Sequence, residues 1–166
     1  AGYAGPIVLD PVMVAKSGDT LLADSAIDAL KSLLFNRASL LTPNLPEAAK
    51  LVGEGSTQSQ AKALLELGVG AVLMKGGHAD GATCIDHLVS QMATQDFSAP
   101  RVNTRNTHGT GCSYSSAIAA GLAQGMALTD AVSRAHSWLH DAILHADDLD
   151  VGLGHGPVHH FHALWT

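Results

Sequence analysis

The stretch "NTHGTGCSYSSAIAAG", residues Asn106–Gly121, joins a glycine-rich turn directly to a run of small and apolar residues that predicts a helix from about Cys112. Gly109 and Gly111 can adopt backbone angles that other residues avoid, so consecutive N–H groups can point into one concavity. The helix N-terminus adds unpaired N–H groups and the positive end of the helix dipole. The pattern predicts an anion hole suited to a phosphate, or to the charge that grows on a phosphate during transfer. Its predicted members are Gly109, Thr110, Gly111 and Cys112.

Cys112 stands at the point where this turn becomes a helix. The field that attracts an anion also stabilises a thiolate, so one physical cause explains both the glycines and the cysteine. Two other interpretations remain open at this point. The turn can be an ordinary strand-to-helix connection with a small buried side chain at Cys112. Alternatively, Cys112 can be a nucleophile with His108 as its base, although such a pair needs a third group to orient the base.

Strands and helices are predicted to alternate on either side of this turn. Three short apolar runs predict buried strands: 7–12, 39–44 and 69–77. Four segments with helical spacing predict helices: 21–35, 45–53, 57–68 and 128–146. Asp24 or Ser25 is expected to cap the first of these helices and Thr129 the last. Residues 82–102 predict a hairpin or meander, and the tail after 146 is expected to be irregular. The order predicts an α/β domain with a largely parallel sheet covered on both faces.

Polar residues follow three of the predicted strands, where ligands collect in such sheets. Asp10 can orient Mg²⁺ or nucleotide phosphates, or can be a turn aspartate before proline. Asn44 and Glu47, three residues apart, can hold the waters of Mg²⁺, or can form a helix cap with a first-turn glutamate. Lys75 can bridge phosphates as a point charge, or can be an ordinary solvated lysine.

Composition restricts the class of protein. The 166 residues are 46% hydrophobic and only 14% charged, which favours one folded domain with a well-filled core. A formal net charge of −6 argues against non-specific nucleic-acid binding, and no apolar run approaches the ~20 residues of a membrane-spanning helix. We therefore expect neither a nucleic acid nor a membrane as partner. Cys84 and Cys112 lie in different contexts and indicate no disulfide framework, which favours a cytoplasmic location.

Five stretches together carry a resemblance to a known family. They are "VLDPVMVAKSGD", "LLTPNLPEA", "VLMKGGH", "NTHGTGCSYSSAIAA" and "VGLGHGPVHHFHALW". In this order they resemble the ribokinase-like superfamily, and within it the hydroxymethylpyrimidine/phosphomethylpyrimidine kinases of thiamine biosynthesis. Cys112 points to this branch, because most of the superfamily resembles this chain at the turn but carries aspartate there.

The resemblance implies a ribokinase-like three-layer α/β/α fold with a mostly parallel central sheet. It implies ATP and Mg²⁺ as cosubstrates, and two successive phosphorylations of a small-molecule substrate. The hydroxymethyl group of the pyrimidine is phosphorylated first, and the monophosphate then becomes the diphosphate.

The resemblance also implies residue roles. Cys112 would be the base that faces the acceptor, and the Gly109–Cys112 backbone would hold the transferred phosphoryl group. Glu47 would serve the metal, together with Asn44. The residues implied at ATP and its phosphates are Asp10, Asn44, Lys75 and Thr107, and Thr107 would also help His108 to shape the anion hole. The histidine-rich ending occurs in the family without serving as a metal site.

Family members carry a further segment ahead of the part that matches Ala1, and the resemblance does not cover that segment. We therefore expect residues 1–166 to be the C-terminal part of a single ribokinase-like kinase domain. A sheet trimmed in this way would expose an edge and apolar surface, so association into a homo-oligomer is expected. Two alternative functions remain: a pyridoxal- or pyridoxine-type vitamin kinase of the same superfamily, and a non-catalytic nucleotide-binding fragment.

Overall fold

The computed structural model describes residues 2–13, 21–78 and 81–165. The chain comprises two compact units, Ala1–Ser98 and Ala99–Thr166. The predicted loop over 14–19 lies outside the described residues. The single domain expected over 1–166 stays a prediction.

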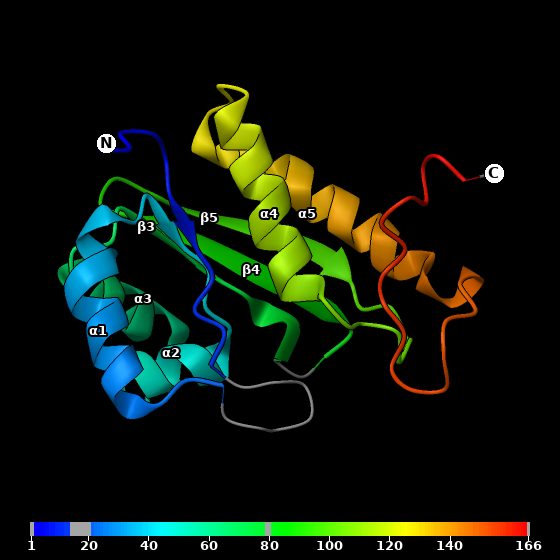
Figure 1. Cartoon of the computed structure of the whole chain (residues 1–166), viewed down its shortest axis with the longest axis horizontal. Helices are drawn as coiled ribbons and strands as arrows, with labels where there is room; N and C mark the ends of the chain where they lie inside the picture. Colours follow the sequence, from blue (N-terminus) through cyan, green and yellow to red (C-terminus); the bar gives the residue numbers. More distant parts are fainter. Residues whose placement is uncertain (1, 14–20, 79–80, 166) are drawn as a thin grey trace. The chain divides into compact units, whose positions relative to one another are not determined.

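The sheet has five strands in the order β1-β2-β3-β4-β5 (Figure 1). Their bounds are β1 Val8–Leu9, β2 Leu40–Leu41, β3 Ala71–Met74, β4 Thr83–Ser90 and β5 Thr94–Pro100. β2 pairs in parallel with both β1 and β3, whereas β3 and β4 are antiparallel. A short turn joins β4 to β5, in which the Ser90 N–H donates to the Ala93 carbonyl at 2.9 Å. The hairpin prediction for 82–102 is confirmed, and the sheet is mixed because this hairpin extends its parallel part.

Three helices pack against the parallel strands: α1 Asp24–Leu34, α2 Leu45–Val52 and α3 Thr57–Glu66. Ile27 of α1, Leu51 of α2 and Leu64 of α3 form one buried cluster with Leu41 and Val72 of the strands. Each such side chain contributes roughly 1.5–3 kcal/mol when it leaves water. The apolar spacing of the helices and the apolar strands therefore build the core of the first unit.

The ends of α2 and α3 follow from local sequence chemistry. Asn44 caps α2 by accepting a hydrogen bond from the Glu47 N–H, and Gly53 ends the helix with a φ of 90° that favours glycine. Ser56 caps α3 by accepting from the Ser59 N–H. Polar caps of this kind typically contribute about 1 kcal/mol each.

The cap predicted for α1 is wrong. The residue that precedes the helix is Ala23, and it makes no side-chain cap hydrogen bond. Asp24 is instead the first helical residue and Ser25 the second. At this position the Asp24 carboxylate acts on the positive end of the helix dipole without capping it.

The second unit contains two long helices, α4 Thr110–Ala123 and α5 Leu128–Leu144 (Figure 1). Gly121 lets them approach, because a Cβ atom there would lie 2.9 Å from the Ala131 Cβ. Helix α4 begins two residues before the predicted start. The cap predicted at Thr129 is wrong, because the residue that precedes α5 is Ala127 and it makes no side-chain cap bond. After a short 3-10 turn, Ala146–Asp148, the tail has no regular element among its described residues, as predicted.

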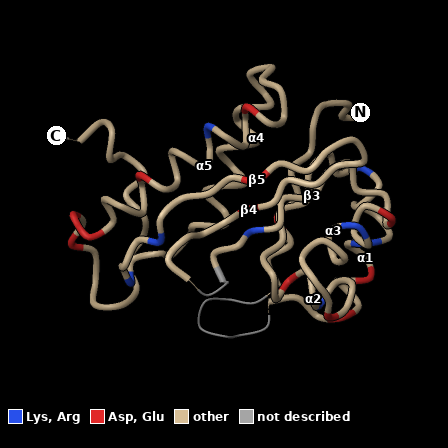
Figure 2. Tube along the Cα trace, turned by 180° about the vertical axis from the view of Figure 1, so that it is seen from behind, with Lys and Arg blue, Asp and Glu red and all other residues tan. Residues whose placement is uncertain are grey.

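Charged residues are unevenly distributed along the described trace, and none lies in residues 106–129 or 151–165. Figure 2 shows lysines and arginines singly or in small groups, with no continuous basic stripe over the described residues. Within that part of the chain, no helix is both long and apolar enough to cross a membrane.

Candidate functional site

The ends of the three parallel strands bring together polar residues that are distant in sequence. Lys75 forms a parallel bridge with Asn44, and its N–H donates to the Pro43 carbonyl at 2.9 Å. The Thr42 N–H donates to the Leu9 carbonyl at 3.0 Å. Because parallel strands end at the same edge, the segments that follow β1, β2 and β3 meet there. The prediction that the polar residues after these three strands gather at one edge of the sheet is confirmed.

Asp10 is the centre of this edge. Its Oδ1 atom accepts from Lys75 Nζ at 2.9 Å and from Thr42 Oγ1 at 3.0 Å. The Asp10 and Lys75 side chains are each only 13% exposed, so Lys75 is not an ordinary solvated lysine. The second Asp10 oxygen, Oδ2, is buried and has no hydrogen-bond partner among the described residues. Since a buried carboxylate oxygen is costly to leave unpaired, it is a natural position for a cation or a donor from a ligand.

Asn44 and Glu47 form a complete capping box at the start of α2. Asn44 Oδ1 accepts from the Glu47 N–H at 2.8 Å, and Glu47 Oε2 accepts from the Asn44 N–H at 2.8 Å. The helix-cap interpretation of this pair is therefore confirmed as a structural role. The capping box leaves other polar atoms of the pair for further contacts, because its two hydrogen bonds involve neither Glu47 Oε1 nor Asn44 Nδ2.

The carboxyl group of Glu47 is electrostatically unusual. It is buried, with 7% of the residue exposed, and loss of hydration raises its pKa above the ordinary value of 4.5. The hydrogen bond from the Asn44 backbone and the charge of Lys75 act in the opposite direction, while the charge of Asp10 raises the pKa further. Glu47 therefore keeps a proton at higher pH than a solvated glutamate, unless a cation compensates its charge.

The donor set at this edge suits Mg²⁺. Among the described residues, no group of three or more His, Cys, Asp or Glu side chains is placed to hold a metal ion. The carboxylates of Asp10 and Glu47 are hard oxygen ligands, and Asn44 precedes Glu47 at the start of α2. Mg²⁺ commonly binds to one or two carboxylates and completes its shell with water and phosphate oxygens. The residues present therefore fit a magnesium ion carried by a nucleotide.

The glycine turn lies in the second unit. Gly109 precedes α4 with a φ of 81°, a left-handed conformation that favours glycine, and no side-chain hydrogen bond caps the helix. The Ser113 N–H donates to the Gly109 carbonyl at 2.9 Å, which closes the first turn. Thr110 and Gly111 are the first two helical residues, and Cys112 follows them as an exposed residue. The interpretation of Cys112 as a small buried side chain is therefore wrong.

Sequence reasoning missed the residues that hold the segment ahead of this turn. Asn106 Nδ2 donates to Asp147 Oδ1 at 2.8 Å, and Asn106 Oδ1 accepts from the Gly156 N–H at 2.8 Å. The His108 N–H donates to the Gly156 carbonyl at 3.1 Å, whereas the Thr107 N–H donates locally to the Arg105 carbonyl at 3.1 Å. Asn106 and Gly156 both lie in stretches that carry the family resemblance, but nothing in the sequence predicts that they meet.

Histidines of the tail pack around the second unit. His160 Nε2 lies 2.8 Å from Ser113 Oγ, one residue after Cys112. The rings of His145 and His162 are stacked, with centroids 5.7 Å apart. These contacts give the histidine-rich ending a structural role beside the start of α4.

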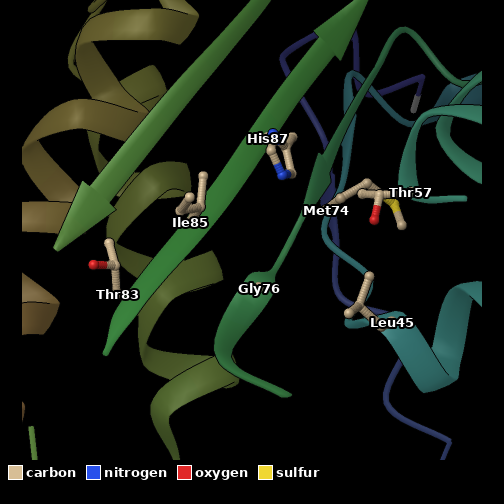
Figure 3. A pocket seen from close by; sticks show the side chains of 7 residues that line it. All are labelled: Leu45, Thr57, Met74, Gly76, Thr83, Ile85 and His87. Carbon is tan, nitrogen blue, oxygen red and sulfur yellow. The ribbon is translucent and has the colours of Figure 1, made fainter. Parts of the chain in front are cut away.

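A separate hollow lies in the first unit, between the starts of α2 and α3 and strands β3 and β4 (Figure 3). Its volume is about 160 Å³, and it is partly open to solvent. The lining residues are Leu45, Thr57, Met74, Gly76, Thr83, Ile85 and His87. None of the predicted site residues lines it, although Gly76 directly follows Lys75.

Comparison with known proteins places the chain in a family. Residues 2–159 match the family described as phosphomethylpyrimidine kinase. The hydroxymethylpyrimidine/phosphomethylpyrimidine kinase of Salmonella typhimurium is 52% identical over 165 residues, which cover 96% of this chain and 62% of that protein.

Solved structures agree with the sequence match. An ADP complex of Bacillus subtilis pyridoxal kinase is 29% identical, with a TM-score of 0.83, over 94% of this chain and 60% of that one. The phosphomethylpyrimidine kinase of Clostridium difficile is 35% identical, with a TM-score of 0.70, over 83% of this chain and 57% of that one. The fold is thus the ribokinase-like α/β fold that the sequence predicted, and the chain spans about 60% of the length of these relatives. The chain belongs to the phosphomethylpyrimidine kinase family.

Proposed function

We propose that the protein containing this chain transfers the terminal phosphoryl group of ATP to 4-amino-5-hydroxymethyl-2-methylpyrimidine, and then phosphorylates the monophosphate to the diphosphate. The observation that carries the proposal is the exposed Cys112 in the first turn of α4, directly after the left-handed Gly109. A base at this position can reach a substrate, and the uncapped helix start favours negative charge. The name of the Salmonella typhimurium relative supports the choice of substrate.

In this proposal the first unit serves the nucleotide. Lys75, fixed by Asp10, would neutralise phosphate charge, and Glu47 and Asn44 would hold Mg²⁺ directly or through the waters of the ion. When bound, the ion neutralises charge on the phosphates. The buried Oδ2 atom of Asp10 supports this assignment, because a cation or donor would satisfy it.

The second unit serves the transferred group. The backbone N–H groups of Gly109–Cys112 are proposed to hold the phosphoryl oxygens, while Thr107 and His108 shape the entrance to the turn. In the first step the substrate hydroxyl must lose a proton, which the Cys112 thiolate accepts. In the second step the acceptor is already a phosphate anion, so orientation and charge neutralisation supply most of the catalysis.

The proposal is tested by incubating the protein with ATP and Mg²⁺ and either hydroxymethylpyrimidine or pyridoxal. We expect phosphorylated pyrimidine as the main product, followed by the diphosphate, as separated by mass spectrometry. Preferred phosphorylation of pyridoxal would assign the chain to the second candidate, which the 29% identical Bacillus subtilis pyridoxal kinase supports less strongly than the 52% identical Salmonella typhimurium relative supports the first. ADP binding without any transfer would indicate a non-catalytic nucleotide-binding fragment.

We infer further that the protein works in the cytoplasm and associates into homo-oligomers. The two free cysteines, Cys84 and Cys112, support the first inference, and exposed apolar side chains such as Leu164 and Trp165 support the second. Sedimentation of the purified protein at several concentrations tests the association, and a monomer at all of them would contradict it.

A further inference from the structure

We infer that Asn106 is a positioning residue that fixes the glycine turn by joining it to Asp147 and Gly156. This inference rests on the proposed function for its catalytic consequence, but its structural part can be tested alone. The term Asn106 clamp denotes four residues: Thr104, Asn106, Asp147 and Gly156. All of them lie in the second unit.

The clamp uses both ends of the Asn106 amide. The Nδ2 group donates to Asp147 Oδ1 at 2.8 Å, and Oδ1 accepts from the Gly156 N–H at 2.8 Å. Thr104 Oγ1 also donates to Asp147 Oδ1 and accepts from the Asn106 N–H at 3.0 Å. A donor and an acceptor are both required at position 106, so neither aspartate nor a hydrophobic residue can replace the amide with Asp147 unchanged.

The clamp is directly coupled to the turn. His108, two residues after Asn106, donates its N–H to the Gly156 carbonyl at 3.1 Å and forms a parallel bridge with Pro157. Gly109 and helix α4 follow at once. Gly156 thus holds the segment that leads into the glycine turn at two points. Its N–H donates to the Asn106 side chain, and its carbonyl accepts from the His108 backbone.

Gly156 is a glycine because the amide occupies the space of a side chain. A Cβ atom there would lie 2.6 Å from Asn106 Oδ1 and 2.9 Å from Asn106 Cγ. Gly156→Ala must therefore displace the amide, whereas Gly154→Ala adds the same methyl group where nothing lies within 4 Å. These two variants form a matched pair that perturbs the clamp from its far side without changing Asn106.

The structural test is hydrogen exchange of the His108 amide in the whole chain, with circular dichroism as the check of folding. Asn106→Ala and Gly156→Ala should each speed this exchange by about tenfold, because the hydrogen bond to Gly156 opens more often. Gly154→Ala should leave it unchanged. Unchanged exchange in both Asn106→Ala and Gly156→Ala would overturn the clamp.

A reciprocal exchange provides the rescue. Asn106→Asp places two carboxylates together and should behave like Asn106→Ala. The double variant Asn106→Asp with Asp147→Asn restores a donor–acceptor pair between positions 106 and 147 and keeps an acceptor for the Gly156 N–H, while the Thr104 hydroxyl changes from donor to acceptor. It should return His108 exchange to within about twofold of the wild type. Failure of this double variant to recover, in a folded protein, would also overturn the clamp.

The catalytic test separates the clamp from the proposed function. In an active protein, Asn106→Ala should lower kcat by about tenfold while changing KM for ATP by less than about twofold, since the turn acts on the transferred group. The double variant should recover most of kcat. Altered His108 exchange with unchanged kcat would contradict the catalytic role of the clamp, whereas inactivity of the wild type would contradict the proposed function and leave the exchange result standing.

Discussion

Lys75 Nζ lies 2.9 Å from Asp10 Oδ1, and the two side chains are equally shielded from water, with 13% of each exposed. Removing one partner of such a pair leaves an uncompensated charge. We expect Lys75→Met to lower the free energy of unfolding by about 3 kcal/mol, measured by denaturant titration. Lys62→Met, on the exposed side of α3, is the control and should change it by less than about 0.5 kcal/mol. Adding Asp10→Asn to Lys75→Met should restore part of the loss, and a further additive loss would contradict the pairing.

The burial of Glu47 predicts a pH dependence of stability. Because its native pKa is raised, the folded chain keeps a proton at pH values where the unfolded chain has lost it. The stability gained in this way is complete below the ordinary value of 4.5 and is lost as pH rises through the native pKa. Glu47→Gln keeps an acceptor for the Asn44 N–H but cannot ionise. Its stability relative to the wild type should therefore improve as pH increases from 4 to 7.

Glu66→Gln provides the control for this series, because Glu66 is an exposed residue at the end of α3. It should follow the wild type at each pH when thermal unfolding is compared. A Glu47→Gln variant whose difference from the wild type is constant from pH 4 to 7 would show that burial does not control this carboxyl group.

The same carboxyl group predicts proton release when a magnesium nucleotide binds. In the proposed function Glu47 serves the metal, and a metal ligand must be deprotonated, so the raised pKa of Glu47 predicts that binding displaces a proton from it. Calorimetry of Mg·ADP binding in two buffers of different ionisation enthalpy should detect this release, which should grow as the pH is lowered toward the native pKa. In Glu47→Gln the release should be absent and the affinity lower. Equal release in both proteins would place the metal elsewhere.

Strand β4 approaches Gly76 so closely that any side chain at this position, next to Lys75, should destabilise the fold. A Cβ atom there would lie 1.8 Å from the Ile85 carbonyl oxygen, so the backbone of β4 would have to move. Gly76→Ala should lower the free energy of unfolding by about 1–3 kcal/mol, as measured by chemical denaturation. Gly77→Ala is the matched control, since nothing lies within 4 Å of its Cβ position. Equal stability of the two variants would contradict the observed approach of β4.

The sequence predicted the parts of the site that depend on local spacing. Asn44 and Glu47 are three residues apart, so a helix start brings them together, and the glycine turn is a continuous stretch. The ion pair of Asp10 with Lys75 spans 65 residues and depends on strand register, which local patterns do not specify. The link from Asn106 to Gly156 spans 50 residues and was missed for the same reason.

The errors at the helix ends have a different origin. Asp24 and Thr129 are good capping residues, but each lies inside its helix, after Ala23 and Ala127 respectively. Cap preferences amount to about 1 kcal/mol, so packing of the apolar face can shift a helix start by one or two residues. Capping chemistry therefore located these helix starts only approximately.

The role of Cys112 is tested most directly by comparing the two phosphorylations in the wild type and Cys112→Ser. A serine hydroxyl cannot serve as a base near neutral pH, so phosphorylation of the hydroxymethyl group should fall by about 10²-fold or more. Phosphorylation of the monophosphate needs no such base and should fall much less. Equal losses in steady-state assays of the two steps, or no loss in either, would contradict the assignment of Cys112 as the base that acts on the hydroxyl group.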